Sequence, residues 1–126
     1  MIHLDTNLLI GIEDPTDPHH MSAREVLAKP DSFACSSVAW MELLSTPDTG
    51  ALREAMKELL SGGIIPFDEA IASLAGELFY LTGSKRRTRL DTMIAASAIL
   101  YGAELATTNP ADFEAFVPHG LKLHSF

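Results

Sequence analysis

Short apolar runs bounded by polar or turn-forming residues recur along the chain and predict buried strands. They lie at residues 2–4, 32–35, 64–67 and 103–107. Pro66 indicates that the third strand lies at a sheet edge or ends there. A weaker run at 120–124 predicts a last strand, also suited to an edge.

Apolar residues at helical spacing fill the intervals between the strands. They predict a helix that resumes at Leu8, and further helices at 21–28, from Ser36 or Ser37 to Leu44, from Thr46-Pro47 through Leu60, at 69–81 and at 90–101. A loop and short helix are expected at 108–113. This alternation, without an internal repeat, predicts one α/β domain over residues 1–126. Its mostly parallel central sheet of four to five strands is flanked by helices.

Composition supports a compact, soluble, cytoplasmic chain. It has 126 residues, is 47% hydrophobic and has a mean hydropathy of +0.14. No apolar stretch approaches the roughly 20 residues of a membrane span, and no signal peptide is expected at the start. The single cysteine, Cys35, excludes an internal disulfide and is interpreted as a small buried strand residue.

The net charge of −8 argues against a general phosphate-binding surface. It does not exclude nucleic acid, because acids grouped around metal ions lower the net charge and are neutralised when the metals bind. Four of the nine basic residues also lie in one window, at 84–89. The distribution of charge is therefore more informative than its sum.

Four acids occur where an α/β sheet would gather them. Asp5 and Asp112 follow apolar strands, Asp91 opens an apolar, alanine-rich helix, and Glu42 lies within another apolar helix. Because the carboxyl ends of parallel strands share one side of the sheet, a single acidic pocket is expected there. Clustered carboxylates repel one another unless cations lie between them, so one or two Mg²⁺ or Mn²⁺ ions and phosphodiester hydrolysis are predicted.

Each acid also has a structural alternative. Asp5 and Asp91 could be simple helix caps, and Glu42 could lie on an exposed helix face. No nucleophile–histidine pattern and no glycine-rich phosphate loop offers another chemistry. The metal interpretation is favoured because all four acids have matching positions.

Four segments in this order resemble PIN domains, and more narrowly the VapC-type toxin ribonucleases. They are LDTNLLI at 4–10, SVAWME at 37–42, LDTMIAASA at 90–98 and ATTNPADF at 106–113. The resemblance covers essentially the whole chain and implies a three-layer fold. It also implies a catalytic quartet that holds Mg²⁺ or Mn²⁺, formed by Asp5, Glu42, Asp91 and Asp112.

The same resemblance assigns supporting positions. Thr6 would be the small polar residue that supports the first acid. Asn109 lies where some members carry a further acid, so the fourth ligand could be Asn109, Asp112 or both. Thr108 departs from the pattern, because many members have a basic residue there, and one phosphate contact is then missing.

The resemblance further implies an RNA substrate, a homodimer and a cognate antitoxin, VapB-like, whose basic side chain reaches the acidic pocket. The cluster of Lys85, Arg86, Arg87 and Arg89 is hypothesised to grip RNA phosphates beside the metal. The alternative is a solvated loop or a patch that binds an acidic partner.

Two other functions compete with the endoribonuclease. One is a PIN-like binding module without catalysis. The other is a different acid-pocket phosphohydrolase, such as an aspartyl phosphatase with Asp5 as nucleophile. Such phosphatases usually carry a second Asp two residues later, where this chain has Asn7.

Overall fold

A five-stranded parallel sheet forms the centre of the computed structural model, which describes residues 1–47 and 52–126. The strand order is β3-β2-β1-β4-β5, and all four pairings are parallel. The strands are β1 (Ile2–Leu4), β2 (Phe33–Ser36), β3 (Gly63–Ile65), β4 (Glu104–Ala106) and β5 (Lys122–Leu123). The predicted α/β class and the two predicted edge strands, β3 and β5, are confirmed.

Helices connect the strands in the predicted order. They are α1 (Thr6–Glu13), α2 (His20–Leu27), α3 (Ser37–Leu44), α4 (Leu52–Leu59), α5 (Glu69–Leu81) and α6 (Arg89–Leu100), with the 3-10 helices η1 (Arg86–Thr88) and η2 (Pro110–His119). The helix α5 has the predicted bounds, whereas η2 extends well beyond the short helix expected at 108–113. Within the described part of the chain, no helix is both long and apolar enough to cross a bilayer.

The predicted helix start at Thr46-Pro47 is wrong. Neither residue is helical, and the Thr46 hydroxyl donates a 2.6 Å hydrogen bond to the Leu43 carbonyl. Thr46 therefore closes the end of α3, a common local role of a threonine hydroxyl. The helix α4 is described from Leu52, and the intervening positions 48–51 lie outside the described residues.

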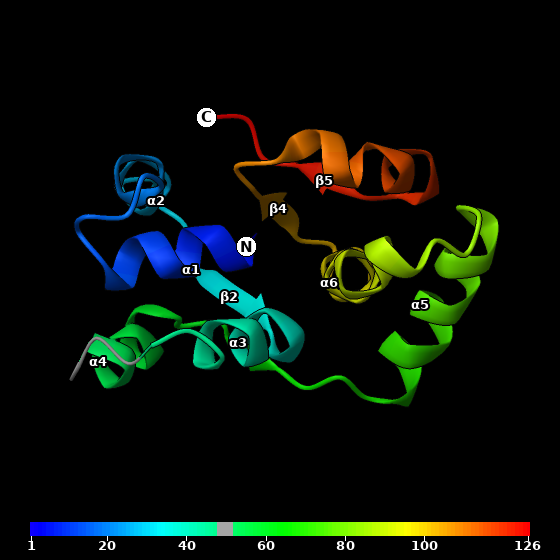
Figure 1. Cartoon of the computed structure of the whole chain (residues 1–126), viewed down its shortest axis with the longest axis horizontal. Coiled ribbons are helices and arrows are strands. Elements are labelled where there is room, and N and C mark those ends of the chain that lie inside the picture. Colours follow the sequence, from blue (N-terminus) through cyan, green and yellow to red (C-terminus); the bar gives the residue numbers. More distant parts are fainter. Residues whose placement is uncertain (48–51) are drawn as a thin grey trace.

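The sheet lies between two groups of helices (Figure 1). The helices α1, α2 and α4 gather on one side of the view, and α5 and α6 on the other. Side chains of β1 alternate accordingly: Ile2 and Leu4 are buried in one cluster with Leu8 of α1, whereas the His3 ring contacts Tyr101 after α6. The three-layer arrangement follows from this alternation.

The helix α6 is buried along most of its length, as its apolar sequence predicts. Ala95, Ala96 and Ala98 are fully buried, and these small side chains allow close approach to the sheet and to α5. Gly102, at φ +61°, ends the segment in a left-handed conformation that other residues rarely adopt. The position of α6 is thereby fixed, and with it the position of Asp91 in its first turn.

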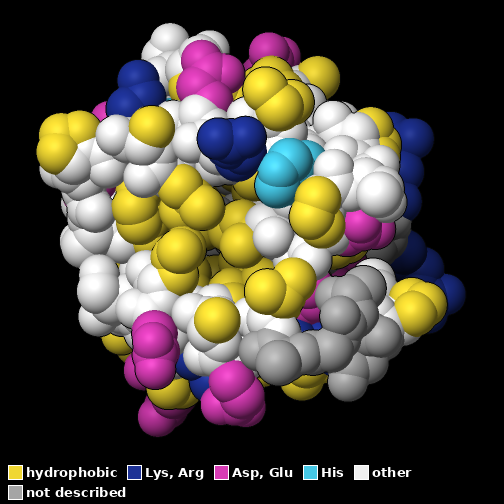
Figure 2. Space-filling view, turned by 90° about the vertical axis from the view of Figure 1, so that its left-hand side faces the viewer, with side chains coloured by type: hydrophobic (Ala, Val, Ile, Leu, Met, Phe, Trp, Pro, Cys, Tyr) yellow, Lys and Arg dark blue, Asp and Glu magenta, His cyan; other side chains and the backbone are white. Residues whose placement is uncertain are grey.

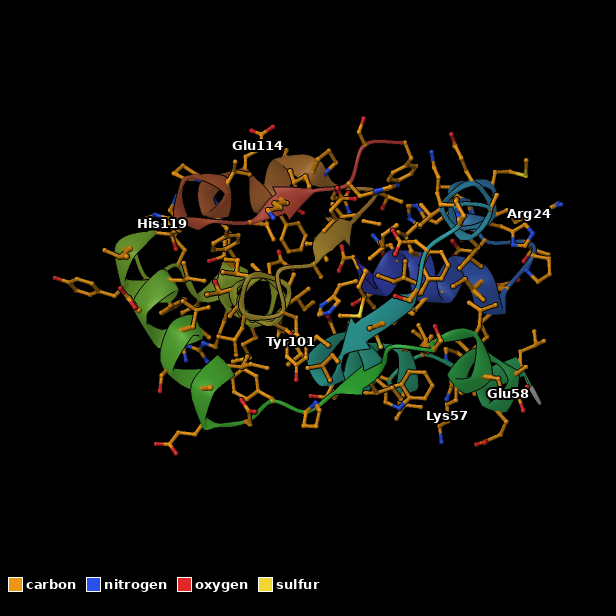
Figure 3. The ribbon with its side chains drawn as sticks, turned by 180° about the vertical axis from the view of Figure 1, so that it is seen from behind. Arg24, Lys57, Glu58, Tyr101, Glu114 and His119 are labelled. Carbon is orange, nitrogen blue, oxygen red and sulfur yellow. The ribbon has the colours of Figure 1, made fainter. Side chains whose placement is uncertain are left out.

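Most charged side chains lie outside this core, and the buried acids Asp5 and Glu13 are exceptions. Figure 3 shows Arg24, Glu58 and Glu114 directed away from the ribbon, while uncharged side chains fill the space between the helices. Cys35 is fully buried in β2, and burial raises the pKa of its thiol to about 12. It is a core residue, as predicted, since a thiol with this pKa is not a nucleophile at neutral pH.

Candidate active site

Asp5 lies at the carboxyl end of the central strand β1, where α1 begins. Its Oδ1 accepts a hydrogen bond from the Thr6 backbone N–H, and its Oδ2 accepts one from the Thr107 hydroxyl, both at 2.8 Å. The residue is only 7% exposed. Asp5 is thus both the helix cap and a carboxylate fixed at the sheet end, so the two alternatives from the sequence do not exclude each other.

Glu42 approaches this point from α3. The Thr6 hydroxyl donates a 2.8 Å hydrogen bond to its Oε1, and the carboxylate belongs to a half-buried residue. Glu42 therefore does not point to solvent from the opposite helix face. Thr6 links the two acids, with its backbone N–H on Asp5 and its hydroxyl on Glu42.

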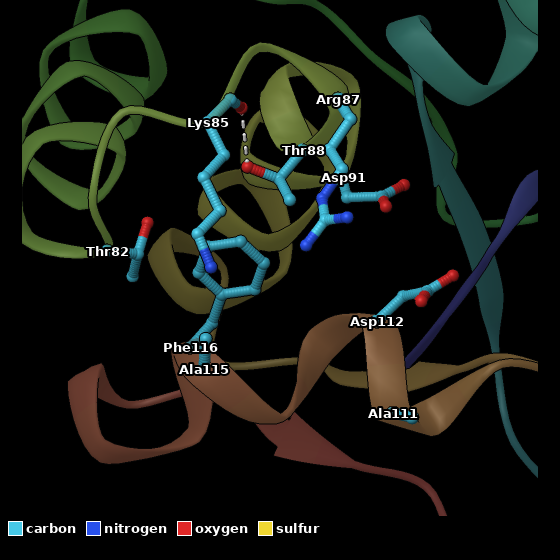
Figure 4. A pocket seen from close by; sticks show the side chains of 9 residues that line it. All are labelled: Thr82, Lys85, Arg87, Thr88, Asp91, Ala111, Asp112, Ala115 and Phe116. Atoms are coloured by element: carbon cyan, nitrogen blue, oxygen red, sulfur yellow. Dashed lines mark hydrogen bonds between the residues drawn. The ribbon is translucent and has the colours of Figure 1, made fainter.

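Asp91 and Asp112 line a pocket of about 460 Å³ (Figure 4). Asp91 projects from the first turn of α6 and Asp112 from the first turn of η2, and the two side chains extend in the same direction from different walls of the pocket. Asp91 is not the helix cap, because the cap position is Thr88 and no side-chain capping bond is present there. Its carboxylate is available to the pocket.

The pKa of Asp91 shows that the four acids act on one another. Burial makes the largest contribution, and the charges of Asp5, Asp112 and Glu42 add to it in that order; together they raise this pKa to about 6. Burial also raises the pKa of Asp5, and the charge of Asp112 adds to this, whereas the hydrogen bonds from Thr107 and Thr6 oppose it. The fold therefore brings Asp5, Asp112 and Glu42 within electrostatic range of Asp91.

These acids do not form a ready-made chelate. Among residues 1–47 and 52–126, no three His, Cys, Asp or Glu side chains are already grouped around a position for a metal ion. The arrangement is an acidic pocket whose members repel each other. Its oxygen donors suit hard divalent cations, and a cation would relieve the repulsion.

Thr107 is a site residue that the sequence analysis missed. It follows β4, the neighbour of β1, and its buried hydroxyl holds Asp5 from the adjacent strand end. The Asn109 backbone N–H donates to the Thr107 oxygen at 3.0 Å, so Asn109 contacts the network through its backbone. The signal was its place as the last residue of the strand predicted at 103–107, but only the strand order puts that strand beside β1.

The basic cluster is divided by η1. Lys85 and Arg87 line the pocket that holds Asp91 and Asp112. Arg89 instead lies with its guanidinium 6.0 Å from the centre of the Phe79 ring, at an apolar pocket between α5 and α6. Arg86 lines neither pocket. Half of the cluster thus faces the acids, and the other half does not.

Comparison with known proteins agrees with this geometry. The family model described as PIN domain matches residues 2–116. The chain belongs to the PIN domain family. The predicted resemblance is confirmed at this level, and the five-stranded parallel fold is that of a PIN domain.

Solved structures include neighbours of nearly the same length. DNA-bound VapBC from Salmonella typhimurium is 25% identical, with a TM-score of 0.71 over 98% of this chain and 96% of that chain. A toxin–antitoxin complex from Klebsiella pneumoniae is 28% identical, with a TM-score of 0.65 over 90% and 91%. FitAcB from Neisseria gonorrhoeae, at 22% identity, shares the fold with a TM-score of 0.73 over 99% and 97%. No curated protein sequence matches the chain.

Because its pKa is raised, the charged Asp91 carboxylate destabilises the metal-free fold. A rise from 3.8 to about 6 corresponds to about 3 kcal/mol, and solvent screening at a half-buried site reduces it to about 1–2 kcal/mol. The folded protein binds the proton more tightly than the unfolded chain. The destabilisation is therefore fully present at a pH above the pKa of Asp91 in the folded protein, and it is absent at a pH below the pKa in the unfolded chain.

We expect Asp91→Asn to raise the free energy of unfolding by about 1–2 kcal/mol at pH 7 in metal-free buffer. The gain should shrink as the pH falls from 6 and vanish below 3.8. Urea unfolding across this pH range measures it. Glu69→Gln is the matched control, since Glu69 is an exposed first-turn acid of α5. A gain that does not depend on pH would contradict the electrostatic explanation.

Proposed function

We propose that this chain is a metal-dependent endoribonuclease and the toxin component of a type II, VapBC-like toxin–antitoxin system. The observation that carries the proposal is the convergence of four carboxylates, seen in the pKa of Asp91, beside a wall that contributes Lys85 and Arg87. PIN family membership and the VapBC and FitAB structural neighbours support it.

Mg²⁺ or Mn²⁺ is proposed as the cofactor, with Asp5, Glu42, Asp91 and Asp112 as the residues that would hold it. The donor set fits, because all four offer carboxylate oxygens and the charges of the other three acids raise the pKa of Asp91. When bound, such a metal lowers the pKa of water and stabilises charge on a phosphate. Exposed Asn109 could add an amide oxygen.

The protein's own residues have separate tasks in this proposal. Thr107 and Thr6 hold Asp5 in one orientation, and Thr6 also orients Glu42, which preorganises two of the acids. Lys85 and Arg87 supply the positive charge that a phosphate needs in an otherwise acidic pocket. The negative net charge is therefore compatible with an RNA substrate.

The proposed antitoxin and the proposed homodimer both require apolar surface. Figure 2 shows apolar side chains gathered in a hollow on the face over α1, α2 and α4, with charged side chains around it. Ile10, Ile12 and Leu27 on these helices are only partly buried. Exposed apolar patches of this kind mark interaction surfaces, which supports a bound partner.

One observation favours the alternative of a non-catalytic binding module: no three acids are grouped for a metal in the described residues. The aspartyl phosphatase is less well supported. Asn7 occupies the position of its second acid, and the Asn7 amide donates to the Thr108 hydroxyl at 3.4 Å. The cleavage experiment below separates the nuclease from the binding module.

The purified chain, freed of any partner, should cleave structured RNA with Mg²⁺ or Mn²⁺ and not with EDTA. Asp5→Asn and Asp91→Ala should each lower the cleavage rate by at least about a hundredfold, because each removes a proposed metal ligand. Gel analysis of labelled RNA measures this, with Glu69→Gln as the control. Equal cleavage by either acid variant would refute the metal site, and metal-independent cleavage would refute the proposed reaction.

The divided basic cluster predicts unequal effects on RNA binding. Lys85→Ala/Arg87→Ala should weaken binding and reduce the slope of log affinity against log salt by about 1.4, since two phosphate contacts on single-stranded RNA are lost. Arg86→Ala/Arg89→Ala removes the same charge from side chains outside the pocket and should change both quantities much less. Fluorescence anisotropy at several salt concentrations compares them, and equal effects would contradict the assignment.

A further inference from the structure

A third pocket, of about 340 Å³, is bordered by Thr107, the residue whose hydroxyl contacts Asp5. The residues after β4, the chain after β5 and the start of α2 form its walls, and Thr107, Thr108, His124, Phe126 and Ser22 are among its lining residues. Its size falls within the usual range of about 300–1,000 Å³ for ligand pockets. Neither the acidic quartet nor the basic cluster lines it.

Thr107 connects this pocket directly to the acidic site. Its hydroxyl donates to Asp5 Oδ2 at 2.8 Å, and the same residue lines the pocket. The chain continues from Thr107 into η2, where Pro110 also lines this pocket and Asp112 lines the acidic pocket. The segment 107–112 thus lines both pockets and contacts Asp5 through Thr107.

The pocket contains an aromatic stack. The rings of His124 and Phe126 lie 5.8 Å apart at an interplanar angle of 20°. His124 is fixed, because its Nδ1 lies 2.8 Å from Glu104 Oε1 and its side chain is only 10% exposed. Phe126 is 41% exposed. A planar ligand can therefore stack on the exposed Phe126 ring, which itself stacks on the fixed His124 ring.

The lining chemistry indicates a neutral, polar ligand. Of the described residues, no Lys, Arg, Asp or Glu lines the pocket, and His124, which does, already pairs with Glu104. Neither a phosphate nor a cation is therefore its natural occupant. Hydroxyl groups of Ser22 and Thr108 line it, and a hydroxyl can both donate and accept hydrogen bonds. The oxygen of Thr108 already accepts from Asn7 Nδ2, which leaves its proton to donate.

We propose that this pocket binds one unpaired RNA base next to the phosphodiester bond that is cut, stacked on Phe126 and contacted by the hydroxyl of Thr108. The proposal rests on the proposed ribonuclease function and adds a base-binding subsite to it. Proteins that recognise RNA read bases that are free of pairing, and stack them on aromatic side chains. The phosphates would then follow the wall that holds Lys85 and Arg87.

The test compares two chains that differ only in their bases. A labelled single-stranded RNA of mixed sequence and an abasic ribose-phosphate chain of equal length are titrated with protein and followed by fluorescence anisotropy. All proteins carry Asp91→Asn, so that the RNA stays intact, with Mg²⁺ present. The variants are Phe126→Ala, Phe126→Tyr as the ring-preserving form, and Tyr80→Ala, which removes an aromatic ring that is 78% exposed on α5.

Phe126→Ala should weaken binding of the RNA about tenfold, which is within the range for loss of one base–aromatic stack, and leave binding of the abasic chain unchanged. Phe126→Tyr should restore the affinity for the RNA, and Tyr80→Ala should leave the affinity for both chains unchanged. An unchanged affinity of Phe126→Ala for RNA, or an equal loss for both chains, would overturn the subsite. Thermal unfolding of each variant verifies that the fold is intact.

Failure of the subsite and failure of the ribonuclease are distinguishable. If the wild-type chain cleaves RNA with metal while Phe126→Ala binds RNA normally, only the subsite is wrong. If the Asp91→Asn protein binds neither chain, and the wild type cleaves no RNA, both the proposed function and the subsite are refuted.

Discussion

Repulsion among four carboxylates at the carboxyl end of a parallel sheet is the constraint on which the candidate site depends. Asp5 is buried at the end of the central strand, and its charge, with those of Asp112 and Glu42, raises the pKa of Asp91, which burial has already raised. Evolution of a stable fold alone would replace at least one of these acids, since a neutral side chain costs less there. The proposed cation would relieve this repulsion. Two neutral residues, Thr6 and Thr107, donate the hydrogen bonds that hold Asp5 and Glu42 in place.

The rest of the structure positions these groups. Parallel pairing of β2, β1 and β4 aligns three strand ends, so residues distant in sequence, such as Asp5 and Thr107, become neighbours. The alanine-rich helix α6 packs closely and brings Asp91 to the same end. The helix η1 then turns Lys85 and Arg87 into the pocket, which provides positive charge within a chain whose net charge is −8.

Much of the fold could be predicted because strand and helix periodicities are local. The placement of Asp5 and Asp112 after strands was sufficient to expect one acidic pocket, since parallel strands end on one side. Thr107 could not be assigned to Asp5, because its role depends on β4 lying beside β1. The division of the basic cluster depends on the 3-10 helix η1. The predicted helix start at Thr46 was wrong because the Thr46 hydroxyl donates a hydrogen bond to the Leu43 carbonyl in α3. In each case a contact between elements or a local hydrogen bond decides the outcome.

Calorimetric titration of the metal-free chain with Mn²⁺ tests most directly whether the four acids act as one metal site. We expect saturable binding by the wild type and by Glu69→Gln, whose substitution lies on an exposed turn of α5. Asp5→Asn and Asp91→Asn should each lose most of that affinity. No uptake of Mn²⁺ by the wild type, or equal uptake by all four proteins, would contradict the account.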